Sequence, residues 1–388
     1  MKKICIITTL WSSITNWIKP FLNEYKNHQI DVTIVCNMDE EYEKKLKEEY
    51  PFVHTKRIPF PRGINVLGSL KSTWALKRLF QKEKFDLVQY STPNASFYAS
   101  LAAKACRVPI RLYCQWGMVY ITQTGIKRKI FKWMERTICK KSTIIQPDSI
   151  GNLEFCRKEG FYNENNSCVI WNGSAKGIDL TAYDICKKNE YSLEIRKKYG
   201  IQDDDVVIGF VGRLGREKGC NELFIAFKNI KRDYPNAKLL FVGPLEKEDT
   251  IEPELLEYFK NCDDIIKTRR VSNVEKYFAA MDVFALPSYR EGFGMSVVEA
   301  SAMGVPVIAT KYPGPSGGMQ DGVSGIAIDI KDVESLERAI RSLIEDRNTA
   351  IRMGEAGRKY VIESFDYEIF KQKYIENRLS LLNIDESN

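Results

Sequence analysis

The chain has 388 residues, of which 44% are hydrophobic and 28% charged, and its formal net charge is +7. This length suffices for about two domains with separate cores, and the composition is that of a soluble globular protein. The sequence argues against a membrane-spanning protein, because no apolar run approaches the roughly 20 residues that a spanning helix needs.

The first half of the chain predicts short strands that alternate with amphipathic helices. This alternation is typical of βαβ units and therefore of a parallel sheet covered on both faces. The first apolar run has no signal-peptide cleavage site and is predicted to be a strand. The predicted strands are KKICIITTL, DVTIVCNM, FDLVQYST, PIRLYCQW and STIIQPDS, and the helices between them include IKPFLNEYKN, SLKSTWALKRLFQKEK and NASFYASLAAKACR.

The same alternation restarts after a polar stretch at residues 181–205 and predicts a second doubly wound domain. The acidic triplet at 203–205 is interpreted as a solvated turn before the next strand. The final segment, 366–388, predicts an amphipathic helix that packs back on the first domain. The strands of this half are DVVIGFVGR, AKLLFVGP, DIIKTRR, DVFALPS and VPVIAT, with NELFIAFKNIKRDYP as one of the intervening helices.

Charge is distributed unevenly between the two halves. Residues 1–180 hold 28 basic and 16 acidic residues, a net of +12, whereas the remainder holds 30 and 35, a net of −5. A basic first domain favours an anionic partner such as nucleic acid, a membrane surface or a phosphorylated acceptor. Ten scattered cysteines without a CxxC pair indicate reduced thiols and a cytosolic protein, and two histidines leave little basis for a metal or triad site.

Open parallel sheets bind ligands at the carboxyl ends of their strands, so the loops there are the candidate sites. The first such loop, GRLGREKG, places Arg213 and Lys218 in a glycine-rich turn before a helix. Two cations, free N–H groups and no obstructing side chains suit a diphosphate. A surface turn with solvated basic residues is the alternative.

A second loop, in LPSYREGFGMSVVEASAMGVPVIAT, carries Glu291 and Glu299 around a Gly-Phe-Gly turn. One interpretation makes Ser296 the helix cap and Glu299 its reciprocal partner in a capping box, but it leaves Glu291 unexplained. Carboxylates beside a helix start can instead hold vicinal sugar hydroxyls. The glycine-rich loop KYPGPSGGMQDGVSG follows the next strand and is expected to line the same site.

Together these segments resemble the family 4 retaining glycosyltransferases. GRLGREKG is similar to the family's diphosphate-binding segment, EGFGMSVVE to its two-glutamate motif, and DGVSGIAI to the strand that follows. The resemblance covers nearly the whole chain and is strongest over 207–328. It implies an α/β protein of the GT-B fold, with two Rossmann-like doubly wound domains facing a central cleft. Residues 1–180 with 366–388 would form the acceptor-binding domain, and 181–365 the nucleotide-sugar-binding domain.

The resemblance also implies roles for single residues. Arg213 and Lys218 would neutralise the donor diphosphate and, with Glu291, form the catalytic group. Glu291 would hold the transferred sugar and Glu299 the ribose. The remaining donor-binding positions are Gly212, Val271 and Val274 at the nucleobase and phosphate, and Gly292, Phe293, Gly294 and Met295 around the sugar and distal phosphate.

Two positions depart from the family pattern. Relatives often have a histidine facing the donor sugar, where this chain has CQWG, so Trp116 with Gln115 becomes the candidate first-domain sugar contact. Tryptophan can stack on a sugar but cannot share a proton as imidazole does. Gly317 stands where relatives often have an acidic residue, which bears on donor selectivity.

The implied function is transfer of a hexose or N-acetylhexosamine, with retention, from a UDP-sugar to a sugar acceptor linked to polyprenyl diphosphate, in bacterial surface polysaccharide synthesis. No metal, cofactor or nucleic acid is expected. The basic helix GIKRKIFKWMERTICKK, residues 125–141, favours peripheral binding to the inner, cytoplasmic face of an anionic membrane, with solvated lysines as the alternative. A nucleotide-sugar epimerase and an inactive nucleotide-sugar-binding subunit are the alternative functions. An oxidoreductase is disfavoured, because TTLWSSITNW has no glycine.

Overall fold

The computed structural model describes residues 1–61, 66–311 and 315–384, and the chain forms two compact units. The first comprises Met1–Lys176 with Ile369–Asn388, and the second comprises Gly177–Glu368. The chain therefore passes between the units at 176–177 and at 368–369, whereas the sequence suggested 180–181 and 365–366. Each unit also has its own apolar core, as a chain of this length should.

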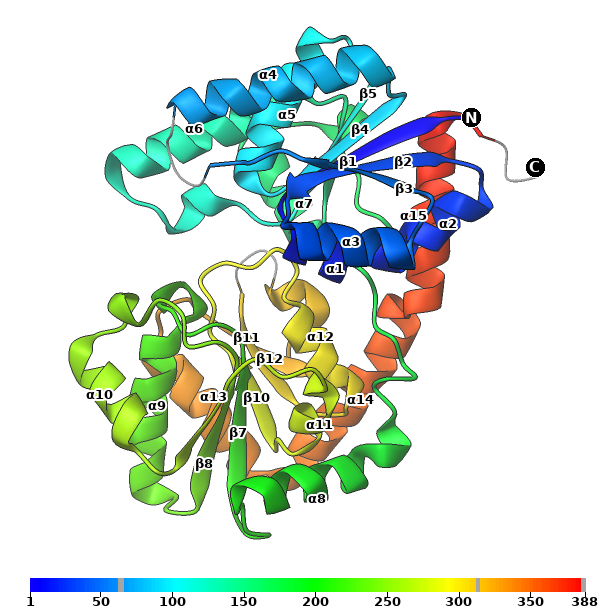
Figure 1. Cartoon of the computed structure of the whole chain (residues 1–388). Helices are drawn as coiled ribbons and strands as arrows, with labels where there is room; N and C mark the ends of the chain where they lie inside the picture. Colours follow the sequence, from blue (N-terminus) through cyan, green and yellow to red (C-terminus); the bar gives the residue numbers. More distant parts are fainter. Residues whose placement is uncertain (62–65, 312–314, 385–388) are drawn as a thin grey trace. The chain divides into compact units, whose positions relative to one another are not determined.

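The first unit is built on a six-stranded parallel sheet in the order β3-β2-β1-β4-β5-β6 (Figure 1). This is the doubly wound order. Successive strands are added on one side of β1 up to β3, and from β4 onward they are added on the other side, so the strand order reverses between β1 and β4. All five strands expected from apolar runs are present. The strands are β1 (Lys3–Leu10), β2 (Asp31–Asn37), β3 (Val53–Arg57), β4 (Leu87–Ser91), β5 (Ile110–Gln115) and β6 (Ile144–Pro147).

Helices cover this sheet, and α5 lies between α4 and α6. The segment IKPFLNEYKN, expected to be one helix, is split, because Pro20 lies in a short 3-10 turn ahead of α2. The helices of the unit are α1 (Trp11–Trp17), α2 (Leu22–Asn27), α3 (Glu40–Glu49), α4 (Val66–Glu83), α5 (Pro93–Ala105), α6 (Gly125–Lys141) and α7 (Ile150–Lys158).

The C-terminal helix α15 (Tyr367–Leu382) packs on the first unit, as the sequence predicts. Tyr374 stacks on Phe21 at a ring distance of 4.1 Å. The fully buried Arg378 donates from Nε to Gln89 at 3.1 Å and from one terminal nitrogen to Gln146 at 2.8 Å. A buried guanidinium is stable only with such partners, so Arg378 ties α15 to strands β4 and β6.

The inner face of α6 is apolar apart from Glu135, a buried carboxylate. Glu135 accepts hydrogen bonds from the Tyr113 hydroxyl at 2.9 Å and from Gln115 Nε2 at 2.5 Å. Burial nevertheless raises the pKa of Glu135 to about 7, because desolvation penalises the ionised form. Met134 and Ile138, two apolar residues of the helix that was predicted to bind a membrane, are also buried and belong to the core.

The raised pKa of Glu135 predicts a pH-dependent stability. Between the usual carboxyl pKa of 4.5 and about 7 the folded protein retains a proton that the unfolded chain has lost. The free energy of unfolding should therefore fall as pH rises through this window, by on the order of 3 kcal/mol for a full shift. Glu135→Gln should flatten this dependence in denaturant unfolding from about pH 4.5 to 8. An equal slope in the variant and the wild type would contradict the assignment.

The second unit repeats the same architecture. Its parallel sheet has the strand order β12-β11-β10-β7-β8-β9, so the strand order reverses between β7 and β10 (Figure 1). The strands are β7 (Val206–Val211), β8 (Ala237–Val242), β9 (Ile265–Thr268), β10 (Val283–Leu286), β11 (Val307–Thr310) and β12 (Gly325–Ile328). The helices are α8 (Lys188–Tyr199), α9 (Cys220–Asp233), α10 (Pro253–Asn261), α11 (Val274–Ala279), α12 (Met295–Ala302), α13 (Val333–Glu345) and α14 (Arg347–Phe365).

Two features of the stretch at 181–205 differ from the sequence interpretation. It contains the helix α8, which polar composition concealed because Ile195 is its one buried side chain. In the turn at 203–205, Asp203 and Asp204 are exposed, but Asp205 is buried and accepts from the Gln202 N–H at 2.8 Å. Asp205 therefore stabilises the turn and is not a solvated residue.

Candidate functional site

The candidate site lies at the carboxyl ends of β7 and β10, the two neighbouring strands between which the strand order of the second sheet reverses. In open parallel sheets ligands bind at such a place, where the connections after two neighbouring strands run to opposite faces of the sheet. The loop after β7 carries Arg213 and Lys218, and the loop after β10 carries Glu291. These residues are far apart in the sequence, and the strand order brings them together.

Lys218 and Glu291 form an ion pair between the two loops. The Nζ of Lys218 lies 2.6 Å from Oε1 of Glu291, and the two side chains are only 17% and 15% exposed. Gly219 allows this approach: its φ is +73°, and a Cβ there would lie 2.0 Å from the Pro287 carbonyl oxygen. The loops are therefore pressed together by backbone contact beside the ion pair.

Arg213 is the more open cation of the site. Its side chain is 42% exposed, and its guanidinium lies 3.6 Å from Glu217 and 3.9 Å from Glu246, which are loose contacts. Burial favours the protonated form of Glu217, but the hydrogen bond from Lys247 and the charges of Lys247 and Arg213 hold the pKa of Glu217 below its usual value. Arg213 can therefore turn toward an anionic ligand while Glu217 keeps Lys247 as its partner.

Arg290 is a third cation here, which the sequence did not single out. Burial lowers the pKa of its guanidinium, and the charges of Glu291, Glu217 and Arg213 act on it. Its Nε is fully buried and has no hydrogen-bond partner within the described residues. Its position next to Glu291 was the available signal, but one arginine in a polar loop is ordinarily solvated. The two loops thus gather Arg213, Lys218 and Arg290.

The helix α12 begins in the loop after β10 with Gly294 as its N-cap, at a φ of +82°. Glycine has no side chain, so the cap supplies no side-chain acceptor for the first N–H groups, and a helix start of this kind favours an anion. Ser296 lies inside the helix, so the capping-box interpretation of Ser296 and Glu299 is wrong. Gly318 packs on this helix, since a Cβ there would meet Val298 at 2.9 Å.

Glu299 lies farther along α12 and has a different neighbour from Glu291. It accepts a hydrogen bond from Tyr183, whose pKa is raised by burial and by the charge of Glu299. Val271 and Val274, expected near a nucleobase, are half-buried against the core, and Val274 begins α11, which contacts α12. The two glutamates are therefore separate acceptors in different surroundings.

The glycine-rich third loop is described only in part. Residues 312–314 lie outside the described residues, so the expectation that they line the site stays a prediction. The loop continues as a short 3-10 turn, Pro315–Gly318, which includes Gly317. This turn contacts α12, and Pro315 lies 3.0 Å from the place that a Cβ on Gly294 would occupy. The described part of the loop thus packs beside the start of α12.

In the first unit the two candidate sugar contacts differ. Gln115 is fully buried, donates to Glu135 at 2.5 Å and accepts from the Tyr162 hydroxyl at 2.9 Å, so its amide serves the core. Trp116 instead lines a small cavity of about 30 Å³, together with Trp17 and other residues. The rings of Trp17 and Trp116 lie 6.3 Å apart. Of the two candidate sugar contacts, Gln115 and Trp116, Trp116 is thus the one that can reach a ligand.

Two family profiles match the chain. Residues 3–149 match the family described as glycosyl transferase 4-like, and residues 192–360 match glycosyl transferases group 1. The second match spans both loops of the candidate site. The capsular polysaccharide biosynthesis glycosyltransferase CapM of Staphylococcus aureus is 31% identical over 346 residues, which are 89% of this chain and 88% of CapM. The chain belongs to the group 1 glycosyltransferases.

Further similarities agree with this family. The UDP-Gal:alpha-D-GlcNAc-diphosphoundecaprenol alpha-1,3-galactosyltransferase of Escherichia coli is 24% identical over 350 residues, 88% of this chain and 86% of that enzyme. The crystal structure of Anabaena HepE in complex with UDP superposes with a TM-score of 0.77 at 17% identity, over 98% of this chain and 100% of HepE. At that identity the likeness shows the fold, which is the GT-B fold of glycosyltransferases.

For this glycosyltransferase the ion pair predicts a measurable coupling. Lys218→Met should leave Glu291 without its cation in a largely desolvated site, whereas Lys218→Met with Glu291→Gln removes both charges. The double variant should therefore be more stable than the two single losses predict, by about 1–3 kcal/mol. Urea unfolding of the four proteins measures this coupling. Additive losses would show that the two side chains do not interact in solution.

Proposed function

We propose that this glycosyltransferase transfers a hexose or N-acetylhexosamine from a UDP-sugar to a sugar acceptor linked to polyprenyl diphosphate. The observation that carries the proposal is the gathering of Arg213, Lys218 and Arg290 with Glu291 at the β7/β10 edge. A diphosphate brings negative charge that three cations can neutralise, and the start of α12 adds N–H groups.

The proposed reaction retains the configuration of the transferred sugar. The bond between the anomeric carbon and the diphosphate oxygen breaks, and its electron pair leaves with the diphosphate. The acceptor hydroxyl attacks from the same face, and its proton passes to the departing diphosphate. Arg213 and Lys218 stabilise the charge that develops on this leaving group, so catalysis is mainly electrostatic and needs no metal ion.

Donor recognition divides between the two glutamates. Glu291, beside Lys218, is placed to accept from hydroxyls of the transferred sugar. Glu299, paired with Tyr183 and on a helix that contacts α11, would hold the ribose while the base lies near Val271 and Val274. Trp116 would stack on the face of the sugar in place of a histidine contact.

The acceptor class follows from the relatives and from charge. CapM is named for capsular polysaccharide synthesis, and the Escherichia coli relative for an acceptor on undecaprenyl diphosphate. A basic first domain, with a net of +12 over residues 1–180 from 28 basic and 16 acidic residues, suits such a diphosphate. We assign this chain to the synthesis of a bacterial surface polysaccharide at the cytoplasmic face of the membrane.

A surface on helices α4 and α6 is proposed to contact that membrane. Four large apolar side chains are exposed on these two helices: Leu70 at 63%, Trp74 at 59%, Ile126 at 77% and Trp133 at 60%. Basic side chains accompany them, whereas Glu135, the one acid of α6, points into the core. Exposed tryptophans among cations are typical of interfacial helices. No helix within the described residues is long and apolar enough to cross a bilayer.

The function is tested by incubating the protein with a lipid-linked acceptor and a panel of nucleotide sugars. One UDP-sugar should yield UDP and an acceptor heavier by one sugar, detected by mass spectrometry. Arg213→Ala should lower turnover at least about 10²-fold, equivalent to about 3 kcal/mol, whereas Arg232→Ala on α9 should not. Nucleotide binding without any transfer, over the whole panel, would favour an inactive binding subunit.

The division between the glutamates predicts different losses. Glu299→Gln should weaken UDP binding, because the ribose loses an ionised acceptor. Glu291→Gln should leave UDP binding unchanged or tighter, since it frees Lys218 for phosphate, and should impair transfer. Calorimetric titration of both variants with UDP measures the difference. Equal loss of UDP affinity in the two variants would show that the roles are divided wrongly.

Membrane contact is tested with vesicles that contain anionic lipid. We expect Lys127→Gln with Lys129→Gln to weaken sedimentation with vesicles at least about tenfold, because each basic residue near the surface contributes about 1 kcal/mol. The second variant, Trp74→Ser with Trp133→Ser, should weaken sedimentation at least about tenfold as well.

The other two basic residues at the start of α6 are left unchanged in this test. Arg128 donates to the Ile121 carbonyl oxygen and Lys132 pairs with Glu159, so replacing either would also disturb the fold. Lys44→Gln with Lys45→Gln on α3 is the matched control and should sediment as the wild type does. Wild-type binding in both test variants would exclude this surface.

A further inference from the structure

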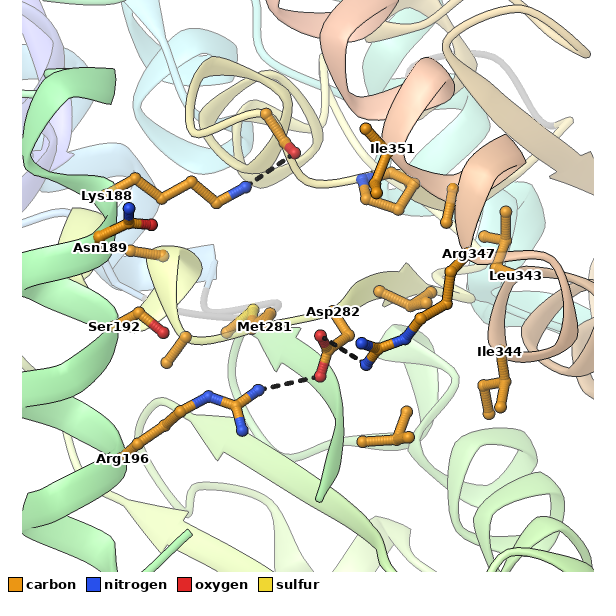
Figure 2. A pocket seen from close by; sticks show the side chains of 17 residues that line it. Lys188, Asn189, Ser192, Arg196, Met281, Asp282, Leu343, Ile344, Arg347 and Ile351 are labelled. Atoms are coloured by element: carbon orange, nitrogen blue, oxygen red, sulfur yellow. Dashed lines mark hydrogen bonds and ion pairs between the residues drawn. The ribbon is translucent and has the colours of Figure 1, made fainter. Parts of the chain in front are cut away.

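A second cavity lies in the second unit, at the opposite end of the sheet from the donor loops. It is lined by residues at the amino ends of β7, β10 and β11, by α8, and by the junction of α13 and α14. Its volume is about 280 Å³. Figure 2 shows Lys188, Asn189, Ser192 and Arg196 on one side and Leu343, Ile344, Arg347 and Ile351 on the other.

The lining is strongly cationic. Lys188, Arg196 and Arg347 face the cavity, and Asp282 is the one carboxylate among the lining residues, which leaves an excess of positive charge. Arg196 lies 3.0 Å from Asp282, which also accepts from the Val207 N–H at 2.8 Å. Arg347 lies 3.6 Å from the same carboxylate and its side chain is 66% exposed. Asp282 is thus already satisfied by Arg196 and the backbone, and Arg347 is loosely held.

Lys188 is a largely desolvated cation in this wall. Its Nζ donates to the Gly304 carbonyl oxygen at 3.0 Å, a neutral acceptor that does not balance its charge. Burial lowers the pKa of Lys188, and the nearby Arg358 lowers it further, against the raising effect of Asp282. An anion in the cavity would supply the missing countercharge, and attraction is stronger there than in bulk water.

The remaining lining narrows the class of ligand. Asn189 and Ser192 offer hydrogen bonds beside the cations, and Leu343, Ile344 and Ile351 form an apolar wall opposite. Ligand cavities for drug-sized molecules begin at about 300 Å³, so this one suits a smaller compound. A phosphate that faces the cations, joined to a ring with hydroxyl groups, matches these charged, polar and apolar side chains.

We propose that this cavity binds a small organic phosphate of about the size of a hexose phosphate, at a site separate from the donor loops. The phosphate lies between Lys188 and Arg347, and the sugar contacts Asn189, Ser192 and the apolar wall. The ligand thereby joins α8 to α14. Helix α8 is the first long helix after the chain enters the second unit at 176–177, and α14 is the last helix that ends before the chain leaves it at 368–369. Because the ligand binds the folded protein and not the unfolded chain, it should also raise the melting temperature of the protein.

Calorimetric titration of the full chain with glucose 6-phosphate tests the site, with glucose as the probe that lacks a phosphate. The wild type should bind glucose 6-phosphate and not glucose. Lys188→Gln and Arg347→Gln should each weaken binding at least about tenfold, because each removes one charge-assisted contact to the phosphate. Arg352→Gln, which removes an exposed charge from the same helix α14, is the matched control and should bind as the wild type does.

Lys218→Met separates this site from the donor site, since Lys218 and its partner Glu291 both lie at the opposite ends of the strands from this cavity, and the variant should leave glucose 6-phosphate affinity unchanged. Arg347 is exposed, so its replacement should leave the melting temperature of the ligand-free protein unchanged. No binding to the wild type, wild-type affinity in Lys188→Gln and Arg347→Gln, or loss of binding in Lys218→Met would each overturn the proposal. None of these results depends on whether UDP-sugars are the donors.

Discussion

The order of the strands in the second sheet is the constraint on which the candidate site depends. Because β7 and β10 are neighbours but the chain leaves them toward opposite sides, their two loops meet at one edge. The contact of Gly219 with the Pro287 carbonyl leaves no room for a side chain between them. The Lys218–Glu291 pair then fixes a cation and an acceptor side by side. A sugar joined to a diphosphate needs both within a few ångströms.

The two units distribute their charge differently. The second half of the chain is acidic overall, yet it concentrates Arg213, Lys218 and Arg290 in the loops after β7 and β10, so its attraction for an anion is local. In the first unit the positive charge is spread over the surface, and its buried groups, Glu135 and Arg378, are held by hydrogen bonds inside the domain. Local charge suits a small nucleotide, and distributed charge suits an extended anionic surface.

Much of this could be predicted from the sequence. Apolar runs predicted most strands and the family resemblance added β12, but β3 was missed because it lies at a sheet edge and alternates buried with exposed polar residues. The helix α8 was missed because it buries so little. The glycine-rich loops identified Arg213, Lys218 and Glu291, but not that Lys218 and Glu291 pair, since their proximity depends on strand order. Arg290 and the buried amide of Gln115 also depend on tertiary burial, which no local pattern shows.

A crystal structure of the protein with UDP would test the assignment of the donor site most directly. The diphosphate should lie beside Arg213 and Lys218 at the start of α12, with Lys218 shared between phosphate and Glu291, and the ribose hydroxyls should contact Glu299. UDP bound elsewhere in the second unit, or bound with the Lys218 side chain turned away from the diphosphate, would contradict the claim that the β7/β10 edge is the donor site.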